Sequence, residues 1–112
     1  MKKIEAIIQP FHLDQVKQAL NDLGIDSITI TDVRGHGRPN GQKQVYRGQE
    51  FVMDVLPQIK IEMVVPDEQS EDVVLAVSRA ARSGDPGDGQ IFISDISDAV
   101  RIRTGFRGDL AL

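Results

Sequence analysis

The chain contains no cysteine, and its aromatic residues are limited to one tyrosine and four phenylalanines among 112 residues. Without cysteine the protein cannot form a disulfide framework, a zinc finger or a thiol nucleophile, which fits a reducing compartment. A sheet-based RNA-binding module stacks bases on aromatic residues of its central strands, and only Phe92 falls on a predicted strand. We therefore expect no nucleic-acid partner.

An excess of positive charge and a long apolar run are also absent. The 13 basic and 17 acidic residues give a formal net charge of -4, so a general attraction to nucleic acid or to an anionic membrane is not expected. Any anion site must therefore be local. The first residues, MKKIEAIIQPF, are interrupted by Glu5, Gln9 and Pro10 and form neither a signal peptide nor a membrane span. We expect a cytoplasmic protein.

Catalytic motifs are missing as well. His12 and His36 lack the spacing of a zinc-binding motif, and no cysteine could complete a metal site. The serines do not lie in a nucleophile elbow, and no segment has the fixed spacing of a Walker phosphate loop. We therefore expect a protein that is not an enzyme and has no metal ligands of its own.

The apolar residues that are present alternate between the period of a strand and that of a helix. Alternating runs predict strands over residues 3–9, 25–33 and 58–65, and spacings of three and four predict two helices. The first helix runs from Leu13 to a left-handed cap at Gly24. Asp67 is the predicted N-cap of the second helix, and Gly84 ends it. The apolar run IFISDI and the alternating piece AVRIR follow.

The order strand, helix, strand, strand, helix, strand predicts one α+β domain over residues 1–112 with a ferredoxin-like fold. Both helices should cover one face of an antiparallel sheet. The opposite face alternates Thr and Lys with apolar residues, so it needs a cover, and self-association is the simplest one. Residues 104–112 form a loosely specified tail.

Residues 35–57, between the second and third strands, are too long, too polar and too glycine-rich for an ordinary connection. A connection of this length without an element of its own is usually functional or disordered, and the residues alone leave both open. The loop carries Arg38 between Gly37 and Pro39, which places a cation beside a glycine-rich turn.

Two further stretches could hold an anion. Three glycines surround Asp88 within residues 83–90 and could direct successive amides toward a phosphate, although a tight turn from helix to strand would use the same residues. Arg101 and Arg103 are two apart on a predicted strand and would project from one face. They could clamp a polyphosphate or lie solvated on an edge.

The chain resembles the PII family of nitrogen-regulatory signal-transduction proteins over nearly its whole length. The resemblance rests on the order and spacing of KKIEAIIQPF, VRGHGR, YRGQEF, VMDVLP, IKIEMVVPD, SGDPGDGQIF and RIRTG. It implies a homotrimer of ferredoxin-like subunits whose sheets line the inside. Three nucleotide sites would lie in the clefts between subunits, and three long loops would project toward targets.

The resemblance also implies roles for individual residues. Thr29 and Val64 would lie around the adenine and ribose, the glycine loop would approach the phosphates, and Arg101 and Arg103 would close the site from the neighbouring subunit. The implied nucleotide-binding residues are Ile7, Thr29, Gly35, Gly37, Arg38, Glu62, Val64, Gly87, Asp88, Gly89, Gln90, Arg101 and Arg103. The implied target-contacting residues are Tyr46, Arg47, Gln49, Glu50 and Phe51.

Several positions depart from the family pattern. Phe51 replaces a tyrosine whose hydroxyl accepts a uridylyl or adenylyl group, and Gln49 replaces a serine that some relatives phosphorylate. Pro39 and Gln58 replace a glutamine that reaches Mg²⁺ and a lysine that faces 2-oxoglutarate. Gln90 replaces a lysine, which makes the γ-phosphate end of the site less positive. We therefore expect loss of the covalent switch and of the 2-oxoglutarate response, with ADP or AMP preferred over ATP.

These features predict a divergent, non-enzymatic PII-type sensor that binds ATP, ADP or AMP and acts on a target through its long loop. The target would be an ammonium-transporter-like membrane transporter, which would bring the protein to the membrane, or an enzyme of nitrogen or carbon metabolism. Two alternatives stay open. One is a trimeric scaffold without nucleotide sensing. The other is an acylphosphatase-like hydrolase, which residues 9–14 disfavour because they contain no arginine.

Overall fold

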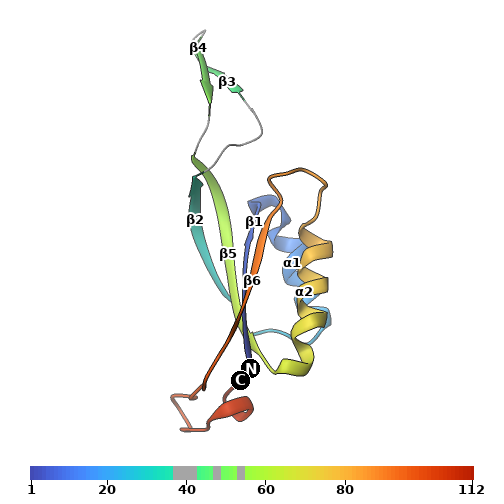
Figure 1. Ribbon diagram of the computed structural model, residues 1–112, viewed down its shortest axis with the longest axis vertical. Helices are drawn as coiled ribbons and strands as arrows, with labels where there is room; N and C mark the ends of the chain where they lie inside the picture. Colours follow the sequence, from blue (N-terminus) through green and yellow to red (C-terminus); the bar gives the residue numbers. More distant parts are fainter. Residues whose placement is uncertain (37–42, 47–48, 53–54) are drawn as a thin grey trace.

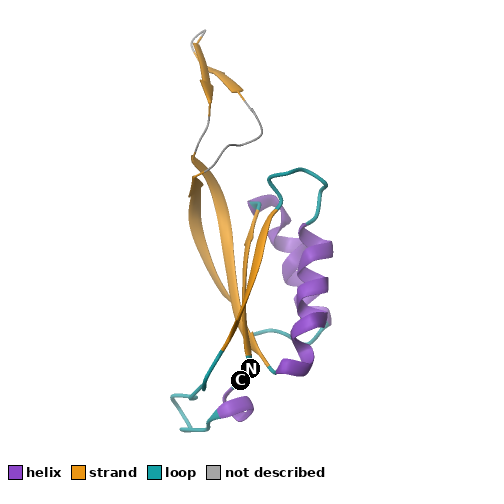
Figure 2. Ribbon diagram, viewed as in Figure 1, coloured by secondary structure: helices purple, strands orange, loops and turns teal. Residues whose placement is uncertain are grey.

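The computed structural model describes residues 1–36, 43–46, 49–52 and 55–112. It has a sheet with two helices on one face and a long protrusion beyond one end of the sheet (Figures 1 and 2). In chain order the elements are β1 (Lys2–Ile8), η1 (Pro10–His12), α1 (Leu13–Asp22), β2 (Thr29–His36), β3 (Lys43–Tyr46), β4 (Gln49–Val52), β5 (Val55–Val65), α2 (Asp67–Ala81), β6 (Gly89–Asp95) and η2 (Gly108–Ala111), where η marks a 3₁₀ helix.

The four long strands form one antiparallel sheet in the order β2-β5-β1-β6. The central strand β1 pairs on one side with β5, where Ile4 lies opposite Met63, and on the other with β6, where Ile4 lies opposite Ile93. The strand order and the two helices on one face confirm the predicted ferredoxin-like α+β fold.

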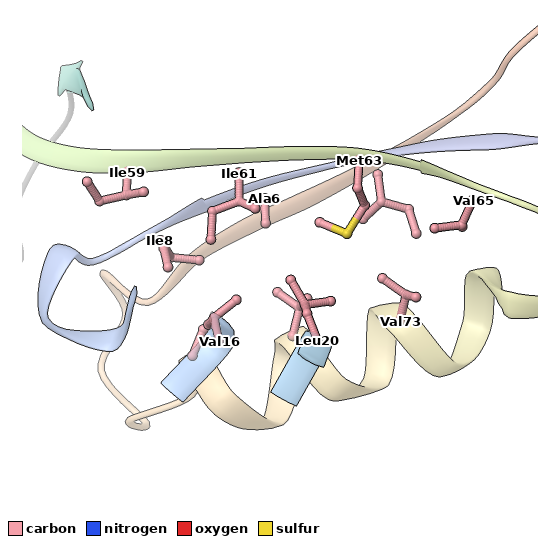
Figure 3. Packing of buried hydrophobic residues seen from close by; sticks show 12 residues of the cluster. Ala6, Ile8, Val16, Leu20, Ile59, Ile61, Met63, Val65 and Val73 are labelled. Atoms are coloured by element: carbon pink, nitrogen blue, oxygen red, sulfur yellow. The ribbon is translucent and has the colours of Figure 1, made fainter. Parts of the chain in front are cut away.

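The core lies between the sheet and the helices (Figure 3). Alternate residues of β1 from Ile4 onward and of β5 from Ile59 onward point toward the helices and are buried, whereas their neighbours are only partly buried. The helices supply Val16 and Leu20 from α1 and Val73 and Val77 from α2, each at most 1% exposed. Burial of each such side chain contributes about 1.5–3 kcal/mol, so the core fixes which face of the sheet stays open.

The predicted bounds of the long loop, residues 35–57, are wrong at both ends, and the loop contains strands that were not predicted. The strand expected over residues 25–33 begins at Thr29 and continues to His36, and β5 begins at Val55. Between them, β3 and β4 pair antiparallel, with Lys43 opposite Val52. Alternation of Ile and Thr located β2 but not its ends, because its last residues, Arg34, Gly35 and His36, are polar or glycine and do not continue the alternation.

Pro57 lies inside β5 instead of ending the loop. A proline is confined to places where its missing N–H is not needed by a neighbouring strand. The pairing of β1 with β5 stops at Ile8 and Ile59, so beyond that point β2 is the only partner of β5 among the described strands. Pro57, opposite Arg34 of β2, stands in this two-stranded extension, where one edge of β5 is open.

Two further expectations near helix and strand ends are corrected. Asp67 is the first residue of α2, Pro66 occupies the cap position, and no side chain caps the helix. The Asp67 carboxylate instead pairs with the amino group of Met1 at 2.8 Å. Among the described residues the last strand is β6, and the alternating piece AVRIR, residues 99–103, is not a strand. Val100 forms an isolated bridge with Arg107, and Ile102 and Arg103 lie in a turn.

Candidate nucleotide-binding site

The glycine loop, residues 83–90 between α2 and β6, is organised around the carboxylate of Asp88. Its Oδ2 accepts hydrogen bonds from the backbone amides of Ser83 and Gly84, each at 2.9 Å, and its Oδ1 accepts one from the Ser83 hydroxyl. These bonds lower the pKa of Asp88, with the Ser83 hydroxyl contributing most. Asp88 therefore closes the loop on itself, and the amides of Ser83 and Gly84 face this carboxylate.

Gly89 joins the loop to β6 in a conformation that favours glycine. Its φ is +114°, and a Cβ there would lie 1.8 Å from the carbonyl oxygen of Ile7. Gly84 also has a positive φ, whereas Gly87 does not. The carbonyl of Gly87 accepts a hydrogen bond from the side chain of Gln9 at 2.9 Å, which ties the loop to the end of β1.

A first cavity of about 280 Å³ lies among the glycine loop, the start of β6 and the last turn of α2. Of the predicted residues it gathers Ile7, Asp88, Gly89 and Gln90. Arg82 also lines this cavity and donates a hydrogen bond to the Ser78 hydroxyl at 3.5 Å. Sequence reasoning missed Arg82, although a cation just before a glycine-rich turn was a signal for it.

A second cavity of about 280 Å³ lies at the other end of the sheet, where the C-terminal residue Leu112 is part of its lining. Of the predicted residues it gathers Thr29, Glu62, Val64 and Arg101. Its remaining lining residues are Lys3, Ser27, Met63, Ala111 and Leu112. None of these five residues was predicted. Ala111 and Leu112 reach the cavity only because the C-terminal segment folds back beside β5.

The open face of the sheet carries a chain of ion pairs beside the second cavity. The Lys3 ammonium lies 3.0 Å from the Glu62 carboxylate and 3.7 Å from that of Glu5. Lys60 lies 3.2 Å from Glu62. Hydrogen bonds from Lys3 and then Lys60 lower the pKa of Glu62. Glu62 is thus fixed as a carboxylate between two ammonium groups, although each such pair adds little stability because it is partly solvated.

Arg101 reaches the second cavity from the segment after β6. Its backbone amide donates to the Phe106 carbonyl at 2.9 Å, and its side-chain Nε donates to the Ala111 carbonyl at 3.2 Å. Arg103 is exposed in the adjoining turn and lines neither cavity. The prediction that both guanidinium groups project from one face of a strand is therefore wrong.

The other predicted nucleotide-binding residues are not gathered into either cavity. Gly35 lies in β2 opposite Leu56, and the side chain of Gln58 packs against it, because a Cβ on Gly35 would lie 2.1 Å from Gln58 Oε1. Gly87 belongs to the glycine loop but does not line the first cavity. Gly37 and Arg38 lie outside the described residues.

The predicted target-contacting residues lie in or next to the β3–β4 pair. Tyr46 ends β3 and pairs with Gln49 at the start of β4, which continues through Glu50 and Phe51. Arg47 lies outside the described residues. The backbone of this pair protrudes beyond the end of the four-stranded sheet (Figure 1).

The fold and the two cavities define a ferredoxin-like protein with two separate candidate ligand sites and a protruding arm. The family model of the nitrogen regulatory protein P-II matches residues 1–106. The chain therefore belongs to the nitrogen regulatory protein P-II family.

Relatives and a solved structure agree with this assignment. The nitrogen regulatory protein P-II of Rhizobium meliloti is 51% identical over 108 residues, which are 96% of each chain. That of Rhodospirillum rubrum is 51% identical over 112 residues, which are 100% of each chain. The crystal structure of Arabidopsis thaliana PII bound to citrate superposes with a TM-score of 0.80 at 37% identity, covering 99% of this chain and 91% of that one.

Family membership makes the protein a non-enzymatic signal transducer of nitrogen regulation, as predicted, and sets aside the hydrolase alternative. Members of the family bind adenine nucleotides and effectors. Within the part of the chain that the structure describes, no helix is long and apolar enough to cross a membrane. The same residues contain no group of His, Asp and Glu side chains suited to a metal ion.

Proposed function

We propose that the protein is a trimeric adenylate sensor in which each nucleotide site combines the first cavity of one subunit with the second cavity of its neighbour. The observation that supports this proposal most directly is the division of the predicted nucleotide residues between two cavities of one chain. Ile7 and the glycine loop supply one half, and Thr29, Val64 and Arg101 supply the other.

The two halves are too far apart to act together within one chain. Gly89 pairs with Ile8 and Val64 pairs with Lys3, so the halves are separated by five residues along β1, or roughly 16 Å. They also lie on different strands across the sheet. A second copy, placed with its second cavity against the first cavity of this one, would bring the halves together and repeat around a closed ring.

Exposed apolar side chains support contact between subunits. They lie on β6 and in the segment that follows it, and they are Phe92, Ile93, Val100, Ile102 and Phe106, each exposed by about half or more. Exposed apolar residues in this number usually mark an interaction surface. Ile102 is fully exposed at the turn beside Arg101, so contact of this turn with a neighbouring subunit would remove an apolar side chain from water.

The proposal is tested by calorimetry with ATP, ADP and AMP, together with a mixing experiment. Arg101→Ala alters the second cavity and Asp88→Ala alters the glycine loop, so each homotrimer should bind ADP weakly. Refolding the two variants together should restore tight binding at those interfaces where both halves are intact. No heat with any adenine nucleotide would overturn the sensor proposal, and no recovery on mixing would overturn the shared site.

We further propose that the 2-oxoglutarate response and the covalent switch are lost in this chain. Phenylalanine at position 51 offers no hydroxyl for a nucleotidyl group, and Gln58 offers a neutral amide where a lysine would face a carboxylate. A lost charge-assisted bond costs about 1.5–3 kcal/mol. Titration of 2-oxoglutarate into the MgATP complex should give weak or no binding, and Gln58→Lys should increase it. Tight binding by the unaltered protein would contradict this proposal.

The protruding β3–β4 pair supports a role in contacting a target, either an ammonium-transporter-like membrane protein or a metabolic enzyme. A nucleotide can favour one arrangement of this arm only by binding that arrangement more tightly. Arg47→Ala should weaken capture of the target and leave the affinity for ADP unchanged. Equal loss of both would show instead that the variant disturbs the nucleotide site.

A further inference from the structure

The segment after β6 is closed by one carboxylate, that of Asp98. Its Oδ1 accepts hydrogen bonds from the backbone amides of Ala99 at 2.8 Å and Gly108 at 3.2 Å. Its Oδ2 accepts one from Arg107 Nε at 2.9 Å. We call this arrangement of Asp98, Arg107 and Gly108 the Asp98 clasp. It holds together two parts of the chain that are ten residues apart.

The clasp determines where the end of the segment lies. Gly108, held by Asp98 and by the Ala99 carbonyl at 3.1 Å, is the first residue of η2. From there η2 leads to Ala111, whose carbonyl accepts the hydrogen bond from Arg101 Nε, and Ala111 and Leu112 line the second cavity. The Asp98 clasp and the second cavity are therefore connected by η2, Gly108–Ala111.

Arg101 is held in a way that leaves most of its donors available. A guanidinium carries five N–H donors in a planar fork, and only the Nε donor is used by Ala111. Among the described residues, the terminal nitrogens of Arg101 have no protein partner in a hydrogen bond or ion pair. Fixing the guanidinium through Nε removes rotamer freedom before an anion arrives, so less is lost when the anion binds.

We propose that the Asp98 clasp is a positioning device for Arg101: it places the Ala111 carbonyl so that the guanidinium is oriented toward a phosphate of a bound nucleotide. This inference rests on the proposed nucleotide site and assigns a role to residues outside it. Asp98 and Arg107 line neither cavity, so they act only through the position of η2. The amides of Ala99 and then Gly108 lower the pKa of Asp98, so the clasp stays charged at neutral pH.

The test is a double-mutant cycle in the full-length protein with ADP as the probe, measured by calorimetry. Asp98→Ala should weaken ADP binding about threefold to tenfold, which corresponds to losing the preorganisation of one long side chain. Arg101→Lys keeps a positive charge but has no Nε to donate to Ala111. In the Arg101→Lys background, Asp98→Ala should therefore have no further effect.

Two comparisons separate this role from general destabilisation. Asp95→Ala is the matched control, because Asp95 is an exposed aspartate that pairs with Lys2 and takes no part in the clasp. The affinity of this variant for ADP should be unchanged. Arg107→Gln, which keeps the amide bonds of Asp98, should weaken ADP binding in the same direction as Asp98→Ala but less, and provides the readout if Asp98→Ala fails to fold.

Three results would overturn the clasp proposal. The first is unchanged ADP affinity in Asp98→Ala or, if that variant fails to fold, in Arg107→Gln. The second is an equal additional loss in the Arg101→Lys background, which would indicate a structural effect independent of Arg101. The third is no ADP binding by the unaltered protein, which would overturn the proposed nucleotide function as well. The first two results leave that function standing, so the two failures are distinguishable.

Discussion

The glycine loop and the segment after β6 use the same device for different purposes. In each, one aspartate accepts hydrogen bonds from two backbone amides: Asp88 from Ser83 and Gly84, and Asp98 from Ala99 and Gly108. Asp88 closes a short turn whose end is fixed by the pairing of β6 with β1. Asp98 closes a longer segment, which continues into η2 and there holds the side chain of Arg101 through the Ala111 carbonyl. The comparison teaches that the same arrangement, one carboxylate that accepts bonds from two amides, can serve two roles. Asp88 fixes the backbone of the glycine loop in one half of the proposed site, and Asp98 supports the position of Arg101 in the other half.

The largest expected effect is a loss of stability when Gly89, which joins the glycine loop to β6, is replaced. Gly89→Ala should destabilise the protein by about 3 kcal/mol or more, because its φ is +114° and the added Cβ would meet the Ile7 carbonyl. Denaturant unfolding measures this change. Gly105→Ala is the control, since its φ is +74° but nothing lies within 4 Å, and it should cost only about 1–2 kcal/mol. Equal losses would show that the contact with Ile7 is unimportant.

The next effect is at the cation of the other half. Arg101→Ala should weaken ADP binding about tenfold to a hundredfold, because a charge-assisted bond to a phosphate is lost. Arg103→Ala should have a smaller effect, since Arg103 does not line the second cavity. Calorimetry gives both affinities. A larger loss at Arg103 would mean that the assembled site differs from the half seen in one chain.

Acid should weaken the Asp88 hub in a defined direction. Because its native pKa lies below the ordinary value, the ionised carboxylate stabilises the fold fully above an unfolded-state pKa of about 4 and progressively less as pH falls through the native pKa. The stability difference between the unaltered protein and Asp88→Asn should therefore shrink on acidification. Ser83→Ala removes the hydrogen bond that lowers the Asp88 pKa most, so the stability contributed by the carboxylate should be lost at a higher pH. A pH-independent difference would contradict the assignment.

The smallest effect concerns the tie between the glycine loop and β1. Gln9→Ala removes the hydrogen bond to the Gly87 carbonyl and should weaken ADP binding by less than about tenfold, as expected for one neutral bond. Gln18→Ala, which removes an exposed bond to Asp22 on α1, serves as the control and should leave ADP affinity unchanged. If Gln9→Ala also leaves the affinity unchanged, Asp88 alone suffices to shape the loop.

The fold followed from the sequence wherever one face of an element is buried. The stripes containing Val16, Leu20, Val73 and Val77 predicted both helices and the face that they cover. The pattern failed where the letters do not follow the structure. The β3–β4 pair was missed because KQVY and QEFV do not alternate between apolar and polar residues. AVRIR does alternate, but within the described part of the chain it forms only an isolated bridge, between Val100 and Arg107.

The candidate site was predictable to the extent that side-chain chemistry supplies it. The glycine-rich run around Asp88 and the positive charge of Arg101 can be recognised directly in the amino-acid sequence. The Ala111 carbonyl and the amide of Gly108 cannot, because every residue has a backbone acceptor and nearly every residue a donor. Asp98 gave no signal for a related reason: its partners Arg107 and Gly108 are brought near only by the return of the chain.

The two-stranded extension of β2 and β5 has a mechanical consequence for the arm. From Val33 opposite Gln58 to His36 opposite Val55, four residue pairs continue beyond the end of β1. Two-stranded ribbons twist more strongly than wide sheets, and here neither flanking strand restrains the twist. We therefore expect the extension to be more strongly twisted than the four-stranded part of the sheet, and this twist should influence the direction in which the arm leaves the sheet.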